Sequence, residues 1–168
     1  MQTVIATRIE STLERVDRTG WDEGPWSSEP DRIEWRYGGF PCLIVRNGIG
    51  ALCGYVGVPL GSKLGNGSYD DVDVQVHGGL TFGGACRPGS PICHTPQPGE
   101  SEVYWYGFDC CHAYDYSPSN SKYVRGRSDG LFAQGDDVYR DVAFVTEEVQ
   151  RLADQLGAIL GQEKDPRP

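Results

Sequence analysis

The chain has 168 residues, 38% of them hydrophobic, which predicts a single compact domain over 1–168 and excludes a disordered chain or a fibre. The net charge of −9 argues against a nucleic-acid partner, and no apolar run is long enough to cross a membrane. Because the first ten residues lack the pattern of a secretory signal, we expect a cytoplasmic protein with no membrane partner.

The first twenty residues carry a helical pattern. Ile5, Ile9, Leu13 and Val16 follow one another at spacings of four, four and three, which places them on one face of a helix. Gly20 stands where such a helix would end. The sequence therefore predicts an N-terminal helix over 1–20.

The segment 31–112 is predicted to form a sheet. Its first three strands, 32–37, 41–46 and 51–58, are separated by tight turns, and Asn47-Gly48 is typical of a two-residue hairpin. Parallel neighbours would need a long crossover, so these strands are predicted to form an antiparallel meander.

Two further strands are predicted later in this region. From 71 to 77 polar residues alternate with three valines, which indicates a strand with one dry face, and 80–82 reads as a short continuation of it. The aromatic segment 103–108 is the next strand, and Asp109 and His112 follow its end.

A C-terminal helix over 136–160 is the clearest element. Seven apolar residues from Val138 to Ile159 alternate by four and three, which forms one seam on a helix, and Asp136 or Asp137 can cap its start. The predicted fold class is α+β: a mainly antiparallel sheet, with one face packed by the N-terminal helix and the long C-terminal helix.

The six cysteines have several interpretations. Without a secretory signal, we expect reduced thiols that are buried or bound to metal. Cys93, His94 and His112 carry ligand types that suit zinc, although their spacing matches no zinc motif, so zinc remains an open cofactor hypothesis.

The histidines at 77, 94 and 112, with Asp109, Asp115 and the nearby cysteines, form one group of polar residues in the sequence. Acid–base chemistry is a second interpretation of this group. Asp109 and His112 can form a carboxylate–imidazole pair, with His77 as a second proton-transfer group. Cys110 or Cys111 beside His112 becomes a nucleophile if its pKa is lowered. The candidate catalytic residues are therefore His77, Asp109 and His112.

Binding of a small nucleotide-like ligand is a third interpretation. The glycines at 78–79 and 83–84 could present backbone N–H groups to an anion, Trp105 or a neighbouring tyrosine could stack on a base, and Arg125 could neutralise a phosphate. The candidate ligand-binding residues are His77, Gly78, Gly79, Thr81, Trp105, Asp109, His112 and Arg125. The acidic residues are dispersed, which is more typical of a solubilising surface than of a protein-binding module or a nucleic-acid mimic.

Three motifs carry a resemblance to other proteins. The segments 53–59, 76–82 and 107–110 with His112 resemble a group of small uncharacterised proteins from phages and actinobacterial genomes, over most of 24–156. The resemblance implies a phage-type cytoplasmic protein. By analogy with phage proteins that act on nucleotide signals of bacterial immunity, we expect a non-enzymatic binder that sequesters such a signal; the alternative is a metal- or His/Asp-dependent hydrolase of a small phosphorylated or nucleotide substrate. Assembly into a homo-oligomer is a further hypothesis about its partners.

Overall fold

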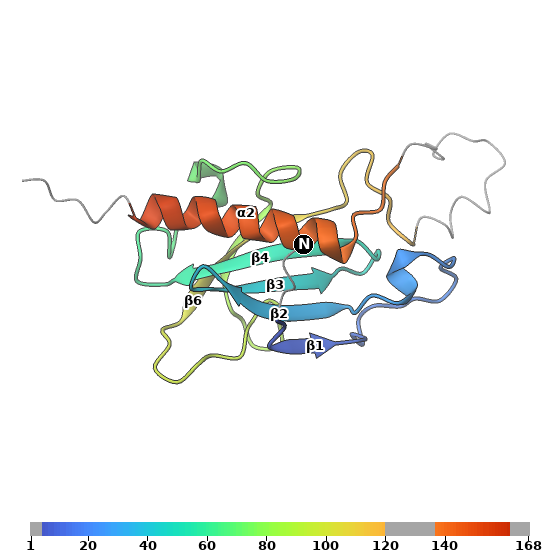
Figure 1. Ribbon diagram of the computed structural model, residues 1–168, viewed down its shortest axis with the longest axis horizontal. Coiled ribbons are helices and arrows are strands. Elements are labelled where there is room, and N and C mark those ends of the chain that lie inside the picture. Colours follow the sequence, from blue (N-terminus) through green and yellow to red (C-terminus); the bar gives the residue numbers. More distant parts are fainter. Residues whose placement is uncertain (1–4, 120–136, 162–168) are drawn as a thin grey trace, which may run out of the picture.

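The computed structural model describes residues 5–119 and 137–161, and in these residues it contains one antiparallel sheet and one long helix (Figure 1). The six strands lie in the order β1-β2-β3-β4-β6-β5. The elements are β1 (Arg8–Glu10), β2 (Arg32–Tyr37), β3 (Phe40–Arg46), β4 (Leu52–Pro59), β5 (Phe82–Ala85), β6 (Val103–Asp109), α2 (Val142–Gly161), and the short 3-10 helices Pro25–Ser27 and Tyr69–Asp71. The predicted α+β class is confirmed. Within the described ranges, no helix combines the length and the apolar character needed to cross a bilayer.

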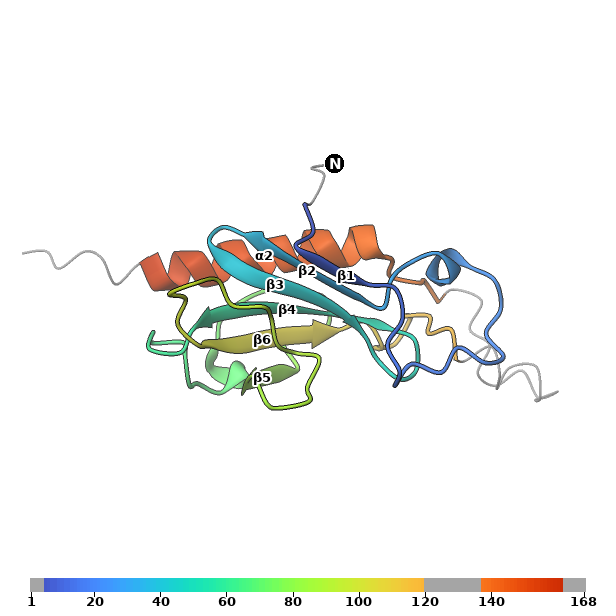
Figure 2. The ribbon, with the colours of Figure 1, turned by 90° about the horizontal axis from the view of Figure 1, so that it is seen from below.

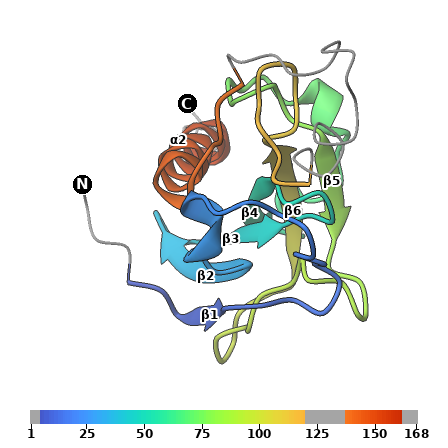
Figure 3. The ribbon, with the colours of Figure 1, turned by 90° about the vertical axis from the view of Figure 1, so that its right-hand side faces the viewer.

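The sheet buries both of its faces. Helix α2 lies across β3 and β4 on one face (Figure 3), where Val149 and Leu152 join a core that includes Ile44 and Val56. The predicted helical seam is confirmed from Val145 to Leu156. On the other face Leu43 belongs to a smaller core, and loops pass over this side of the sheet in Figure 2. Because both faces are covered here, β3 from Pro41 to Arg46 and β4 from Leu52 to Val58 are buried at every position instead of alternating.

Gly54 lets the helix approach the sheet closely. A Cβ atom at this position would lie 2.5 Å from Val149 of α2 and 2.6 Å from Phe108 of β6. Such distances are far inside van der Waals contact, so only a residue without a side chain fits between the two layers.

The start of α2 is held by a residue more than one hundred positions earlier in the chain. Glu29 accepts hydrogen bonds from the Val142 N–H at 2.6 Å and from the Tyr139 hydroxyl at 2.7 Å. Asp141 accepts from the Phe144 N–H at 2.9 Å. These carboxylates satisfy donors that every helix start leaves open. The helix therefore begins at Val142, later than the predicted 136.

A buried ion pair lies beside this contact. Asp31 and Arg46 both have side chains with no exposed surface, and Arg46 Nε lies 2.9 Å from Asp31 Oδ1. Arg18 also donates to Asp31, and the Leu13 N–H donates to its second oxygen at 2.8 Å. Arg46 donates in turn to the Tyr139 hydroxyl at 2.8 Å. The network ties the N-terminal segment to the sheet and to the residues that precede α2.

The predicted N-terminal helix over 1–20 is wrong. In its place, β1 pairs with β2, and Ile5 and Ile9 are 86% and 58% exposed. An isolated helix of this length is marginal in water unless its apolar face is buried. Pairing with β2 satisfies the backbone of that strand, while the bonds from Leu13 and Arg18 to Asp31 hold the following residues in an irregular path.

The predicted strand over 71–77 is also wrong, although its alternation is meaningful. Val76 is buried, whereas Asp73 is exposed, as the pattern requires. The backbone of this segment bonds to side chains of α2 instead of to a neighbouring strand: Gln155 accepts from the Gln75 N–H at 2.7 Å and donates to its carbonyl at 2.8 Å. The short continuation expected at 80–82 is replaced by β5, which begins at Phe82.

The expectation of reduced cysteines is wrong for two of the six. Cys86 and Cys93 form a disulfide that closes a short loop, whereas Cys42, Cys53, Cys110 and Cys111 are free. The expectation rested on cellular compartment alone, which says nothing about how closely a loop brings two thiols together.

Candidate functional site

A tight turn at residues 112–115 follows the end of β6 and assembles the candidate site. The Asp115 N–H donates to the His112 carbonyl at 3.0 Å, and the His112 N–H donates back to the Asp115 carboxylate at 3.0 Å. Tyr114, between them, has φ +71°, the single positive φ among the described residues other than glycine. A bulky residue in this region is strained and persists only where its surroundings hold it.

Asp115 is the centre of the first half of the site. Its carboxylate has no exposed surface, and its two oxygens lie 3.0 and 2.8 Å from His77 Nε2. Arg140 donates its Nε–H to the same carboxylate at 3.0 Å. A backbone bridge between Asp115 and Val138 brings the two segments together. The His77 N–H donates to Glu148 of α2 at 2.8 Å, which fixes the backbone from which the imidazole extends.

Asp109 and His112 form the second half. His112 Nε2 lies 3.2 Å from Asp109 Oδ1, and Thr81 donates to the other oxygen of Asp109 at 2.9 Å. The two imidazoles, of His77 and His112, lie with their centres 5.9 Å apart. Gly78 makes this approach possible, because its φ is +68° and a Cβ there would lie 2.2 Å from the His112 ring.

Both carboxylates remain ionised well below neutral pH. Burial would raise the pKa of Asp115, but the bonds from His77, Arg140 and the His112 N–H outweigh burial and lower it. Burial likewise opposes ionisation of Asp109, and bonds from Cys111 and Thr81 lower its pKa. Each imidazole therefore faces a negative charge.

The cysteines beside the site are poor nucleophiles. Burial and the bonded Asp109 carboxylate raise the pKa of Cys111 to about 12. Burial also raises the pKa of Cys110. A thiol becomes reactive when its pKa falls, so the structure corrects the hypothesis that either residue is an activated nucleophile.

Several predicted ligand-binding residues lie elsewhere or have other roles. Trp105 is fully buried and packs against His94, so its ring is enclosed and cannot stack on a base. The neighbouring Tyr106 belongs to the core under α2. The Gly79 N–H closes a turn onto the Val76 carbonyl at 2.9 Å. Arg125 lies outside the described residues.

The three predicted zinc ligands do not form one cluster. Cys93 is bonded to Cys86, His94 pairs with Glu100 at 3.0 Å, and His112 belongs to the site at the end of β6. Over residues 5–119 and 137–161 no group of three or more His, Cys, Asp and Glu side chains could hold a metal ion.

Two residues of the site were missed at the level of sequence. Arg140 lies at the entry to the predicted C-terminal helix, and nothing in its spacing points to Asp115. Tyr114 lies between His112 and Asp115 in the chain, and the residue is 62% exposed. Its position two residues after His112 is the signal that the sequence offered.

Comparison with known proteins yields no relative: no protein-family model, no curated protein and no solved structure matches the chain. The resemblance to phage and actinobacterial proteins stays a prediction.

Proposed function

We propose that the two imidazole–carboxylate pairs form an acid–base centre that hydrolyses a small phosphorylated substrate. The observation that carries the proposal is the His77–Asp115 pair, in which a fully enclosed carboxylate contacts one ring nitrogen of a histidine whose side chain is 19% exposed. A carboxylate in this position fixes the tautomer of an imidazole and stabilises its protonated form.

The roles follow from the hydrogen bonds. With its Nε2–H donated to Asp115, His77 carries the lone pair on Nδ1 and acts as the base that takes a proton from water. Water attacks phosphorus, the bond from phosphorus to the leaving oxygen breaks, and protonated His112 gives its proton to that oxygen. His112 fits this role because its side chain is 32% exposed and its Nε2 lies 3.2 Å from Asp109 Oδ1.

The preference for a phosphoryl group rests on Arg140. Its Nε–H is used by Asp115, and its guanidinium carbon lies 4.9 Å from the centre of the Phe144 ring, which holds the group flat. A guanidinium held in this way can offer its remaining N–H groups to phosphate oxygens.

Simple binding without bond cleavage is the competing hypothesis. A phage-type protein that sequesters a nucleotide signal would use the same side chains and release its ligand unchanged.

One experiment separates the two hypotheses. The protein is incubated with bis(p-nitrophenyl) phosphate and with a panel of linear and cyclic nucleotides, and products are followed by 31P NMR. We expect turnover that falls by about 100-fold or more in His77→Ala and His112→Ala, since one general acid or base contributes about 10²–10⁴-fold.

The third histidine provides the control. His94 pairs with Glu100 at 3.0 Å but lies on the other face of the sheet, so His94→Gln should keep full turnover. Recovery of every compound unchanged, or equal turnover in all three variants, would refute the proposed activity.

A further inference from the structure

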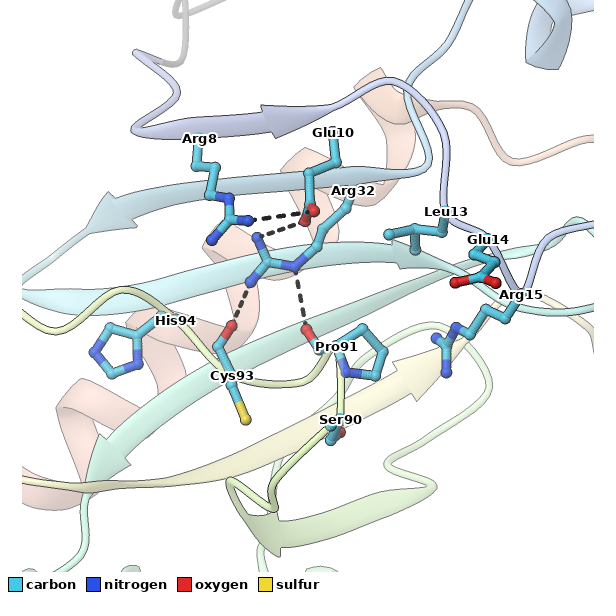
Figure 4. A pocket seen from close by; sticks show the side chains of 11 residues that line it. Arg8, Glu10, Leu13, Glu14, Arg15, Arg32, Ser90, Pro91, Cys93 and His94 are labelled. Atoms are coloured by element: carbon cyan, nitrogen blue, oxygen red, sulfur yellow. Dashed lines mark hydrogen bonds and ion pairs between the residues drawn. The ribbon is translucent and has the colours of Figure 1, made fainter.

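A groove of about 720 Å³ lies on the face of the sheet opposite α2, between the N-terminal segment and the loop closed by the disulfide (Figure 4). Its volume falls in the range of small-molecule sites. The groove is distinct from the acid–base centre, because His94 lines the groove whereas His77 and His112 do not.

The loop wall of the groove is fixed before any ligand arrives. Arg32, whose side chain is 5% exposed, donates to the carbonyls of Pro91 (3.1 Å) and Cys93. The Cys86–Cys93 disulfide closes the same loop covalently. A wall held at both points loses little conformational freedom on binding, which favours affinity.

Arg32 itself is not available to a ligand. Beyond the two carbonyls, it pairs with Glu34 at 3.1 Å and with Glu10 at 3.4 Å. The charge of Arg32 is therefore compensated within the floor of the groove. A ligand would be recognised by the more exposed residues around it.

Two arginines extend from the N-terminal segment on either side of Arg32 in Figure 4. Arg8 has a side chain that is 55% exposed, with one ion pair to Glu10 at 3.3 Å. Arg15 is exposed near the opposite end. In a chain of net charge −9, these two exposed guanidinium groups line the same recess. Guanidinium groups bind phosphate or carboxylate with paired hydrogen bonds.

Two carboxylates narrow the class of ligand. Glu10 and Glu14 also line the groove, and they accept hydrogen bonds from hydroxyl groups but repel a second anionic group. We propose that the groove binds a small hydroxylated anion, whose phosphate or carboxylate pairs with one of the two arginines while its hydroxyl groups bond to the other arginine and donate to Glu10 and Glu14.

The test uses three probes of similar size: glucose 6-phosphate, gluconate and neutral glucose. Binding to the full chain is followed by the 15N NMR signals of the arginine side chains and of residues 89–94. We expect the two anions to shift the Arg8 and Arg15 signals with saturation, and glucose to have no effect; whichever anion binds more tightly identifies phosphate or carboxylate. The proposal is overturned if neither anion shifts these signals at millimolar concentrations, or if glucose binds equally well.

A matched arginine controls for general charge effects. Arg151 on α2 has a side chain that is 56% exposed and pairs with Glu148 at 2.9 Å, so it resembles Arg8 in exposure and pairing. Arg8→Gln and Arg15→Gln should each weaken binding by about tenfold or more, because each removes a charge-assisted contact. Arg151→Gln should bind as the wild type. Equal weakening in all three variants would assign the binding to overall charge and end the proposal.

Removal of the disulfide tests the fixed loop wall separately from the arginines. The double variant Cys86→Ser/Cys93→Ser keeps both arginines but releases the loop, so the affinity of this variant for the tighter-binding anion should fall severalfold. Wild-type affinity in this variant would refute the pre-formed wall.

Discussion

Removal of the Asp31 carboxylate tests how much the buried ion pair between Asp31 and Arg46 contributes to stability. Asp31→Ala leaves the Arg46 guanidinium with no exposed surface and with Glu29, at 3.9 Å, as its nearest remaining carboxylate. Removing one partner of a buried ion pair costs about 3–5 kcal/mol, because the other charge stays buried without compensation. For a chain of this size, about 2–4 °C of melting temperature is lost per kcal/mol, so a fall of about 6–20 °C is expected.

Calorimetry and urea unfolding would measure this loss. Asp73→Ala is the matched control, because Asp73 is exposed and its removal should change the unfolding free energy by less than about 0.5 kcal/mol. Asp31→Asn keeps the shape of the side chain and should lose less stability than Asp31→Ala. If Asp31→Ala unfolds within about 1 kcal/mol of the wild type, the ion pair does not hold the N-terminal segment to the sheet as described.

Three further predictions concern single positions. Gly54→Val should destabilise the protein by about 1–3 kcal/mol in urea unfolding, because its side chain would overlap Val149; unchanged stability would mean that α2 does not approach β4 so closely. Tyr114→Gly should raise stability by about 0.5–1 kcal/mol, since the relief of a left-handed residue (about 1–2 kcal/mol) exceeds the entropic cost of glycine (about 0.5–1 kcal/mol); a lower melting temperature would argue against the strained turn. Burial of Glu100 opposes its ionisation, but bonds from the Gln97 N–H, Arg36 and His94 outweigh burial and lower its pKa to about 2. A lowered pKa contributes stability that is present above the unfolded value of about 4.5 and lost as pH falls toward 2, so acid unfolding curves of wild type and Glu100→Gln should converge over this range; parallel curves would contradict the assignment.

Local patterns in the sequence predicted most of the fold. The β2 strand has the predicted bounds, and the apolar seam of α2 packs as its spacing indicates. These elements combine periodicity with explicit turn residues, so local and tertiary preferences agree. A turn does begin at Asn47, but residues 47–51 connect β3 to β4 in place of the predicted two-residue hairpin.

The two wrong elements show what hydrophobic periodicity does not report. The valines of 71–77 do face the core, but alternation reports which side is buried and not what the backbone bonds to. In this protein Gln155 of α2 replaces a neighbouring strand. The isoleucines of the N-terminal segment match a helix equally well, yet the open edge of β2 and the Asp31 carboxylate determine the path.

The candidate site was accessible to sequence reasoning only in part. Asp109 and His112 are near neighbours in the chain, and the alternation over 71–77 places His77 at the end of a predicted strand. No local pattern predicts Arg140, because its contact with Asp115 depends on a bridge between two segments that are distant in the sequence. The prediction for Trp105 is wrong because its position in β6 does not reveal which face of the sheet it occupies.

The contact between Glu29 and the start of α2 has a consequence for biosynthesis. As the chain leaves the ribosome, every strand of the sheet emerges before residues 142–161, and until then the apolar face over β3 and β4 lacks its cover. The Val142 N–H and the Tyr139 hydroxyl reach Glu29 only after these residues have left the exit tunnel. The core under α2 is therefore completed only once residues 142–161 have emerged, and until then the nascent chain exposes an apolar surface that chaperones can recognise.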